Sequence, residues 1–165
     1  MGAPFVERVH GDLDPPAIDS VLADESLLVI LATLLNDRRL FETVRAVTGC
    51  DPIACFHPVI YRFDPRPEHH DAWHGDNDGN RLVAMSINIG GPFDGGVLQF
   101  REGPAGPVLH EAANTVAGDA ILFRIRPGLE HRVTGVTGTR PRLAAAGWFQ
   151  RDRPFLQVLK NVFGR

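Results

Sequence analysis

Cysteine is scarce in this sequence. Only Cys50 and Cys55 occur among its 165 residues. Two cysteines are too few for the disulfide framework of a small secreted domain. They lie five positions apart without a second pair, so a zinc knuckle is also excluded. We therefore expect two buried free thiols in a reducing compartment.

The sequence also lacks long apolar runs, long basic runs and a recognisable leader. Its most apolar stretch, Leu27–Leu35, is well short of the roughly 20 residues that span a bilayer. The N-terminus carries acidic residues in place of the basic segment of a signal peptide. The formal net charge is −3 at pH 7, which argues against nucleic acid as an obligatory partner. We expect a cytoplasmic protein with no membrane partner, and its oligomeric state is left open.

The N-terminal part of the chain has a helical pattern. Between Ala17 and Gly49, leucine and isoleucine recur at spacings of three and four residues, which is typical of a helix with one apolar face. Asp37 is a candidate N-cap for a helix over Arg38–Val47, and Gly49 is expected to end it. We interpret this segment as a scaffold that packs against a sheet. The residues expected on its buried side are Leu28, Leu31, Leu35, Leu40, Val44 and Val47.

After Gly49 the pattern changes to short runs of β-branched and aromatic residues separated by Pro, Gly and Asp turns. Many short strands with turn signals between them favour a sandwich or a barrel. The length fits one domain, residues 1–165, with the helical scaffold at about 17–49 and the strands at about 53–149. A last helix is expected at Phe155–Phe163. The predicted strands are Ile53–Phe63, Leu82–Ile89, Gly96–Arg101, Ala120–Ile125, Glu130–Val136 and Arg142–Phe149.

One short motif is suited to metal binding. His74 and Asp76 are two residues apart, so on an extended backbone their side chains point to the same side. A third ligand from a distant strand would complete a set of two histidines and one carboxylate, which leaves coordination positions open and is typical of non-haem Fe(II) oxygenases. His131 is our candidate for that third ligand. Two neighbours, His69 and His70, are expected to be exposed loop residues or to lie behind the ligands.

The motif belongs to an ordered series of patterns. His-x-Asp is followed by Gly95-Gly96-Val97-Leu98, by Gly118-Asp119 ahead of Phe123, by His131-Arg132-Val133, by Gly138-x-Arg140, and by Trp148-Phe149. This series, from about Val59 to Phe149, resembles the prolyl-4-hydroxylase-like members of the 2-oxoglutarate/Fe(II) oxygenase superfamily. The resemblance implies a mainly β (α+β) fold with a double-stranded β-helix, or jelly roll, backed by the N-terminal helices. It also implies Fe(II), 2-oxoglutarate and O2 as cofactors, and succinate and CO2 as coproducts of a hydroxylation.

The same resemblance suggests which residues bind the cosubstrate. The distal carboxylate of 2-oxoglutarate needs a buried, permanently charged partner, and the planar fork of arginine suits a carboxylate. Arg140 is our candidate, on the assumption that the chain turns at Thr137-Gly138 and pairs back on the strand of His131. Asn88 is a second candidate, although a strand-end asparagine can equally bond to the backbone. Tyr61 is a third, and it can equally be a core aromatic residue.

The expected substrate is a small molecule or a peptide, with an amino acid or peptide side chain as the first hypothesis. Two alternatives stay open from the sequence. One is a cupin-like metal-binding or sensor domain without turnover, and the other is a cupin dioxygenase that uses no cosubstrate. Neither needs a buried cation at the end of the cavity, so the direction in which Arg140 points is the feature that separates them from an oxygenase.

Overall fold

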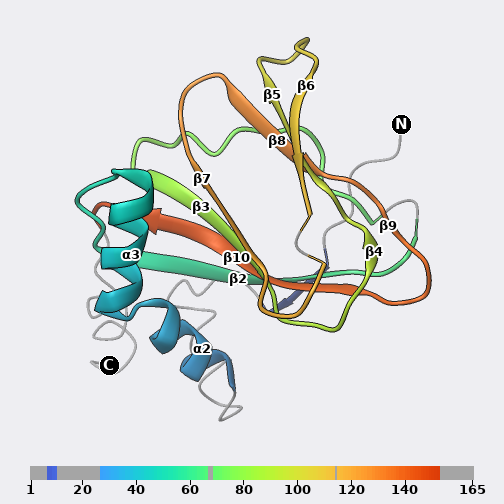
Figure 1. Ribbon diagram of the computed structural model, residues 1–165, viewed down its shortest axis with the longest axis horizontal. Coiled ribbons are helices and arrows are strands. Elements are labelled where there is room, and N and C mark those ends of the chain that lie inside the picture. The colour runs from blue at the N-terminus through green and yellow to red at the C-terminus, as the bar shows by residue number, and fades with distance from the viewer. Residues whose placement is uncertain (1–6, 11–26, 67–68, 114, 153–165) are drawn as a thin grey trace.

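A computed structural model describes residues 7–10, 27–66, 69–113 and 115–152. Two layers of strands face each other, and two helices lie at one side of the larger layer (Figure 1). The expected mainly β jelly-roll architecture with helices against it is confirmed. The elements are β1 (Glu7–His10), α2 (Leu27–Leu35), α3 (Arg38–Thr48), β2 (Cys55–Phe63), β3 (Arg81–Asn88), β4 (Asp94–Gly95), β5 (Leu98–Glu102), β6 (Val108–Ala112), β7 (Ala120–Arg124), β8 (Leu129–Val133), β9 (Val136–Thr137) and β10 (Arg142–Gln150).

The larger sheet has the strand order β1-β2-β10-β3-β7, and all of its pairings are antiparallel. Strand β10 lies between β2 and β3 and brings small residues to the middle of the sheet, with Ala144 opposite Tyr61 and Ala146 opposite Ser86. At Gly147 an added Cβ would lie 1.9 Å from the carbonyl oxygen of His57. Only glycine therefore allows the two backbones to approach this closely.

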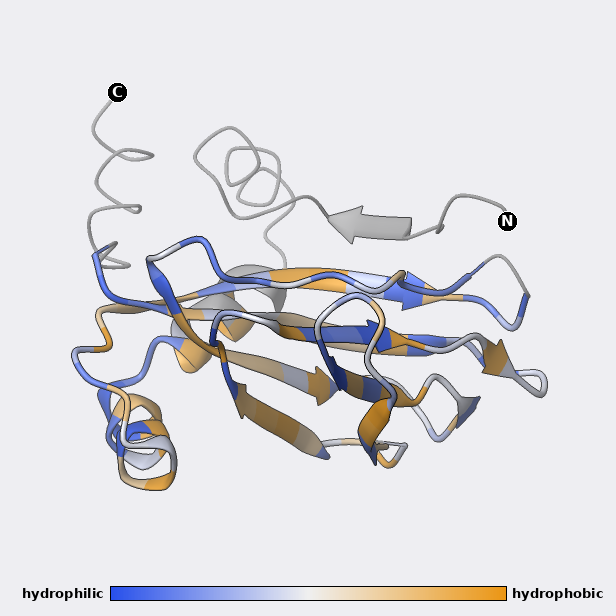
Figure 2. Cartoon of the chain, turned by 90° about the horizontal axis from the view of Figure 1, so that it is seen from above, coloured by the Kyte–Doolittle hydropathy of each residue, from blue (hydrophilic) through white to orange (hydrophobic). Residues whose placement is uncertain are grey.

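The facing layer consists of two smaller sheets, one with the order β6-β5-β8 and one formed by β4 and β9. Apolar segments recur on the strands of both layers and on the helices, as the hydropathy colouring shows (Figure 2). One buried cluster lies within the smaller sheets and the end of β2, and is formed by Phe63, Phe93, Leu98, Phe100, Val133 and Val136.

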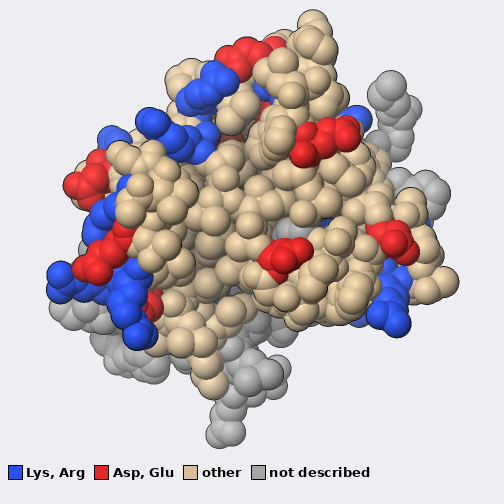
Figure 3. Space-filling view, in the orientation of Figure 1, with Lys and Arg blue, Asp and Glu red and all other residues tan. Residues whose placement is uncertain are grey.

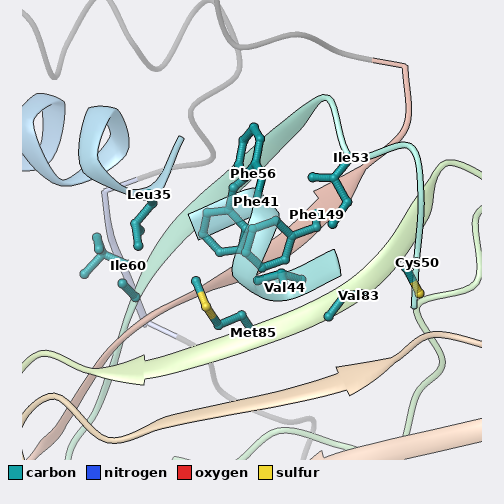
Figure 4. Packing of buried hydrophobic residues seen from close by; sticks show 11 residues of the cluster. Leu35, Phe41, Val44, Cys50, Ile53, Phe56, Ile60, Val83, Met85 and Phe149 are labelled. Atoms are coloured by element: carbon teal, nitrogen blue, oxygen red, sulfur yellow. The ribbon is translucent and has the colours of Figure 1, made fainter. Parts of the chain in front are cut away.

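Strand alternation gives the larger sheet two different faces. Val83 and Phe149 point to the helices and belong to the main buried cluster. Their neighbours Ala84 and Trp148 point the other way and line a cavity between the layers. Figure 4 shows how Phe41, Val44, Phe56 and Phe149 pack together on the helix side. The rings of Phe56 and Phe149 lie 4.6 Å apart, centroid to centroid.

Helix α3 begins and ends where the sequence predicts. The Asp37 side chain accepts a hydrogen bond from the Arg39 backbone N–H at 2.7 Å, and Gly49 adopts a left-handed conformation with φ of 70°. Capping by Asp37 satisfies one of the N–H groups that have no partner inside the helix. The residues buried on α3 are Phe41 and Val44, whereas Val47 is 74% exposed. The prediction that Val47 is buried is therefore wrong.

The prediction for the leucines of the two helices is confirmed in part. Leu35 is buried, and Leu31 and Leu40 are half-buried against the same cluster. The side chain of Leu28, residues 17–26 and the expected helix at 155–163 lie outside the described residues. The two cysteines are free and buried, as expected.

The strand predictions agree with the structure to within about two residues at most ends, but four strands were not predicted. They are β1, β4, β6 and β9. Strand β6 has mostly exposed side chains, so it has no buried apolar face to mark it in the sequence. Strands β4 and β9 are only two residues long each.

Charged side chains of both signs lie mostly toward the edge of the face in Figure 3, and one acidic group lies near its middle. Among the described residues, no helix is both long enough and apolar enough to cross a bilayer.

Candidate active site

The two histidines of the site are held side by side by their backbones. His74 and His131 form an antiparallel β-bridge in which each donates its N–H to the other's carbonyl, at 3.0 Å and 2.8 Å. Residues paired in this way project their side chains to the same face of a sheet. The two imidazole rings lie 4.2 Å apart, centroid to centroid. The bridge thus fixes two ligand groups that are far apart in the sequence.

Asp76 completes the group. Its carboxylate oxygens lie 3.9 Å from His74 Nε2 and 3.6 Å from His131 Nε2. The candidate ligand atoms of the three residues all lie within 4.8 Å of one another. Two imidazole nitrogens and one carboxylate oxygen that converge on one point can hold an Fe(II) ion. The structure therefore brings together the three residues that the sequence singled out.

The histidines are in a form suited to a metal. His74 Nδ1 lies 2.8 Å from the carbonyl oxygen of Ala72, and a carbonyl only accepts, so the proton is on Nδ1 and Nε2 is left to bind a cation. Burial lowers the pKa of His131 to about 4, assisted by His74 and opposed by Asp76. At neutral pH His131 is thus an uncharged imidazole, which is the ligating form.

Arg81 holds the carboxylate of Asp76 in place from behind. Its Nη1 donates a hydrogen bond to Asp76 Oδ1 at 3.3 Å, and its Nε lies 2.9 Å from Asp78 Oδ2. The guanidinium also stacks on the ring of Trp148, 3.7 Å from its centroid. A planar cation between two carboxylates and an aromatic face has little freedom to move. Asp76 is only 7% exposed.

The three residues lie in the wall of a cavity between the two layers of strands. The cavity has a volume of about 80 Å³, several times the space that one water molecule needs. Most of the remaining wall is apolar, with Phe63, Leu98, Phe123, Val133 and Trp148 among its side chains. Its other polar side chains are Tyr61, Asp71, Ser86 and Arg142.

Arg142 is a buried cation in the same cavity. It is 4% exposed, and its Nη2 donates a hydrogen bond to Ser86 Oγ at 2.8 Å. Its Nε is buried without a hydrogen-bond partner among the described residues. Burial lowers the pKa of Arg142 to about 10, opposed by Asp71 and Tyr61, so the guanidinium stays charged at neutral pH. A buried cation with an unused donor is suited to an incoming anion.

Arg140 does not lie in this cavity, contrary to the expectation from the sequence. It is exposed in the bend before β10. The assumed hairpin is absent because β9 pairs with β4, whereas β10 pairs with β2 and β3. Strand alternation therefore begins only at Arg142, and the inward-facing cation is that residue.

The two other candidates have different surroundings. Asn88 is fully buried, but its side chain accepts from Gly90 N at 2.9 Å and donates to Gly91 O at 3.4 Å. The Asn88 side chain thus stabilises the turn after β3 by bonding to the backbone. The sequence left this role open beside a contact with the cosubstrate. Tyr61 lines the cavity and lies close enough to Arg142 to affect its pKa.

The loop before the motif is anchored by a histidine. His69 is 3% exposed, and its Nδ1 accepts a hydrogen bond from Asp64 N at 2.8 Å. It is therefore a buried loop residue and not an exposed one. His70 is half-buried, and neither histidine belongs to the group around Asp76.

Two polar residues of the cavity, Asp71 and Arg142, were not assigned to the site from the sequence. The alternation along Arg142–Phe149 already puts Arg142 on one face with Ala146 and Trp148, and this was the signal that could have found it. Asp71 has no such signal, because it lies in a loop without a repeating pattern.

A family model described as the 2OG-Fe(II) oxygenase superfamily matches residues 59–150, more than half of the chain. The chain belongs to this superfamily. The family assignment implies Fe(II), 2-oxoglutarate and O2 as cofactors. The cavity fits them, because its donor set suits Fe(II) and the unpaired Nε of Arg142 suits a carboxylate.

Solved structures with the same fold include two bacterial proteins. A prolyl-4-hydroxylase from Pseudomonas putida is 24% identical with a TM-score of 0.51, and the match covers 82% of this chain and 63% of that one. An oxidoreductase of the 2OG-Fe(II) oxygenase family from Burkholderia pseudomallei is 20% identical with a TM-score of 0.58, covering 90% and 67%. The chain thus spans about two thirds of the length of these oxygenases. A search of curated proteins found no match.

Proposed function

We propose that this protein is a 2-oxoglutarate- and Fe(II)-dependent dioxygenase that hydroxylates an unactivated C–H bond of an amino acid or a peptide side chain. In the overall reaction, O2 gives one oxygen atom to the new C–OH group and the other to succinate, and 2-oxoglutarate loses CO2. The observation that carries the proposal is one cavity that contains both the His74, Asp76 and His131 group and a buried arginine, Arg142.

His74, Asp76 and His131 are the proposed Fe(II) ligands. When bound, Fe(II) and 2-oxoglutarate supply the oxidative chemistry, and the protein supplies binding, orientation and the exclusion of water. The β-bridge between the histidines and the contact of Arg81 with Asp76 hold the ligands in position before the metal arrives. Such a preorganised group has little conformational freedom left to lose on binding.

Arg142 is the proposed partner of the distal carboxylate of 2-oxoglutarate. This replaces Arg140, which is exposed outside the cavity. In the guanidinium group of Arg142, Nη2 donates a hydrogen bond to Ser86 Oγ. The buried Nε has no hydrogen-bond partner among the described residues. A carboxylate that accepts hydrogen bonds from this guanidinium would replace the interactions with water that the cation loses on burial. Tyr61, on the neighbouring strand β2, is proposed as a further contact to the cosubstrate.

The substrate is proposed to lie against the apolar wall. Phe123 and His131 are in ring contact at 4.9 Å, so an apolar group beside the metal ligands would be shielded from water. A prolyl-4-hydroxylase among the proteins with this fold favours an amino acid or peptide as the substrate.

The cupin-like alternatives are less well supported. A metal-binding or sensor domain without a cosubstrate has no use for a buried cation in the wall of the cavity, and burying one is costly. Arg142 occupies such a position with 4% exposure. This observation favours the oxygenase over both alternatives.

The decisive experiment is a titration of 2-oxoglutarate into the anaerobic Fe(II) protein, followed by the metal-to-ligand charge-transfer absorbance. The Arg142→Met variant should require at least about 100-fold more 2-oxoglutarate, because removing one partner of a buried ion pair costs about 3–5 kcal/mol. Iron retention, measured by metal analysis, should be unchanged.

Arg140→Met is the matched control, since it removes the same charge two residues away. It should leave the 2-oxoglutarate affinity within about 2-fold of the parent. If the parent protein shows no binding of 2-oxoglutarate, the oxygenase proposal is wrong and the cupin alternatives gain. If the Arg142 variant binds as tightly as the parent, the role of that residue is wrong.

A further inference from the structure

Trp73 immediately precedes His74, one of the proposed metal ligands, and the proposed reaction does not use it. It is half-buried, and the cavity wall, as far as the structure describes it, does not include it. The guanidinium carbons of Arg101 and Arg132 lie over its indole, 4.3 Å and 4.7 Å from the ring centroid. Indole is the aromatic group that attracts a cation most strongly. Trp73 is thus the shared partner of two arginines.

Both arginines project from the face of the β6-β5-β8 sheet that is turned away from the cavity. In β8, Arg132 lies between His131 and Val133, which both line the cavity, and side chains alternate along a strand. In β5, Arg101 follows Phe100, which belongs to the buried cluster inside the smaller sheets. The indole therefore lies on the outer face of this sheet, behind the histidine ligands.

Each arginine is held in place by a further partner. Arg101 Nε donates a hydrogen bond to Glu130 Oε2 at 2.7 Å, and Arg132 Nε donates one to Gln99 Oε1 at 2.7 Å. Gln99 Nε2 donates in turn to Glu111 on β6. These partners lie directly opposite one another in the sheet, with Arg101 across from Glu130 and Gln99 across from Arg132. The two guanidinium groups thus have fixed positions from which they hold the indole.

The segment that carries His74 depends on such support. None of the strands includes it, and its β-bridge to His131 consists of two hydrogen bonds. Trp73 precedes one histidine of the bridge and Arg132 follows the other, so their contact lies directly beside the bridge. Because successive Cα atoms are only about 3.8 Å apart, a side chain fixed at Trp73 limits how far His74 can shift.

We propose that Trp73 is a positioning residue, which holds His74 in the orientation that a metal ion requires through its contacts with the two arginines. The inference rests on the proposed function, because it takes His74 as a metal ligand. Residues behind the ligands of a metal act by fixing the orientation of those ligands. Trp73 does this for an imidazole from the outer face, as an arginine does for the carboxylate ligand.

The test measures metal binding without cosubstrate and without turnover. Co(II), whose visible absorbance depends on its coordination geometry, is titrated into the protein in the absence of oxygen. Trp73→Ala should bind Co(II) about 10- to 100-fold more weakly than the parent, which is the range for residues behind a metal's ligands, and its absorption bands should shift. Trp73→Phe keeps an aromatic face for the arginines, so it should recover most of the affinity and the spectrum of the parent.

A double-mutant cycle identifies the contact that is responsible. Arg132→Met should weaken Co(II) binding by about 3- to 10-fold, the range for one cation–π contact. The same change should have little further effect in the Trp73→Ala background, because the contact is already gone there. Arg126→Met is the matched control, since Arg126 is an exposed arginine ahead of β8 that is paired with Glu102. Its loss should change the Co(II) affinity by less than about 2-fold.

The outcomes separate the two proposals. Parent-like Co(II) affinity and spectrum in Trp73→Ala overturn the positioning role, whatever the melting temperature of that variant. A loss in Arg126→Met as large as that in Arg132→Met overturns it as well. If Trp73→Ala does not fold, as judged by circular dichroism, Arg132→Met decides, and parent-like binding by that variant overturns the role. A parent protein that binds no Co(II) contradicts the metal site of the proposed function, and the role of Trp73 falls with it.

Discussion

At the scale of single residues, the site depends on a difference between Arg140 and Arg142. The two arginines are two positions apart, so strand alternation alone gives them the same face. Arg140 lies in a bend and is exposed, whereas Arg142 is the first residue of β10 and is buried in the cavity. The strand pairs with β2 from that residue onward and with β3 from Ala144 onward. Where a strand begins therefore decides which of two identical side chains faces the cavity.

A prediction about the metal ligands belongs to the same scale. His74→Ala and Asp76→Ala should each lose bound Fe(II) on anaerobic dialysis, because each removes a donor from a group of only three. The loss should exceed the roughly 10- to 100-fold that follows from altering residues behind a metal's ligands. His70→Ala is the control for His74, since it removes an imidazole from the same segment outside the group. Iron retention by His74→Ala equal to the parent would contradict the assignment.

At the scale of elements, α3 has a single buried face that its sequence defines only in part. The helical pattern allows Val44 and Val47 on the same side, because residues three apart are neighbours on a helix. Val44 is 1% exposed and packs in the cluster with Phe41 and Phe149, whereas Val47 in the last turn is 74% exposed. The sheet covers the middle of the helix and not its end.

This difference gives a matched pair of variants. Val44→Ala should lower the free energy of unfolding by about 2 kcal/mol, since it removes two buried methyl groups and leaves a small cavity. For a chain of this size the melting temperature should fall by about 4–8 °C. Thermal unfolding followed by circular dichroism measures the change.

Val47→Ala is the control, and its melting temperature should stay within about 1 °C of the parent or rise slightly, because alanine favours a helix more than valine does. Binding of 2-oxoglutarate should be unchanged in both variants below their melting temperatures. A weaker cosubstrate affinity in Val44→Ala would contradict the proposal that the helices are scaffold.

At the scale of the whole molecule, the cavity is assembled from segments that are distant in the chain. Asp71, His74 and Asp76 come from one loop, His131 from β8 and Arg142 from β10. A metal and a cosubstrate that contact all of these segments bind only the folded chain. Their binding should therefore stabilise the whole fold by mass action.

Thermal unfolding can measure this linkage directly. A metal ion at 100 times its dissociation constant should add about 2.7 kcal/mol, which corresponds to a rise in melting temperature of roughly 5–10 °C. 2-Oxoglutarate should give a further rise only when metal is present. Asp76→Ala should lose both increments, whereas Arg142→Met should lose only the second. A rise of the same size in Asp76→Ala would place the metal elsewhere.

Much of this protein is already determined by its sequence. The two-residue spacing of His74 and Asp76, the distant His131, the capped helix from Arg38 and most of the strands depend on local periodicity and on side-chain chemistry. These features are visible without a structure, because each one is set by a few neighbouring residues.

The tertiary structure alone decides the rest. It places Arg142 in the cavity wall and leaves Arg140 exposed. It also uses the Asn88 side chain to stabilise a turn and places Asp71 in the cavity wall. The physical reason is that these choices depend on which strands pair and where pairing starts. In this chain β9 pairs with β4 and not with its neighbour in sequence, β10. Such long-range pairing depends on the packing of the whole molecule, and no local pattern records it.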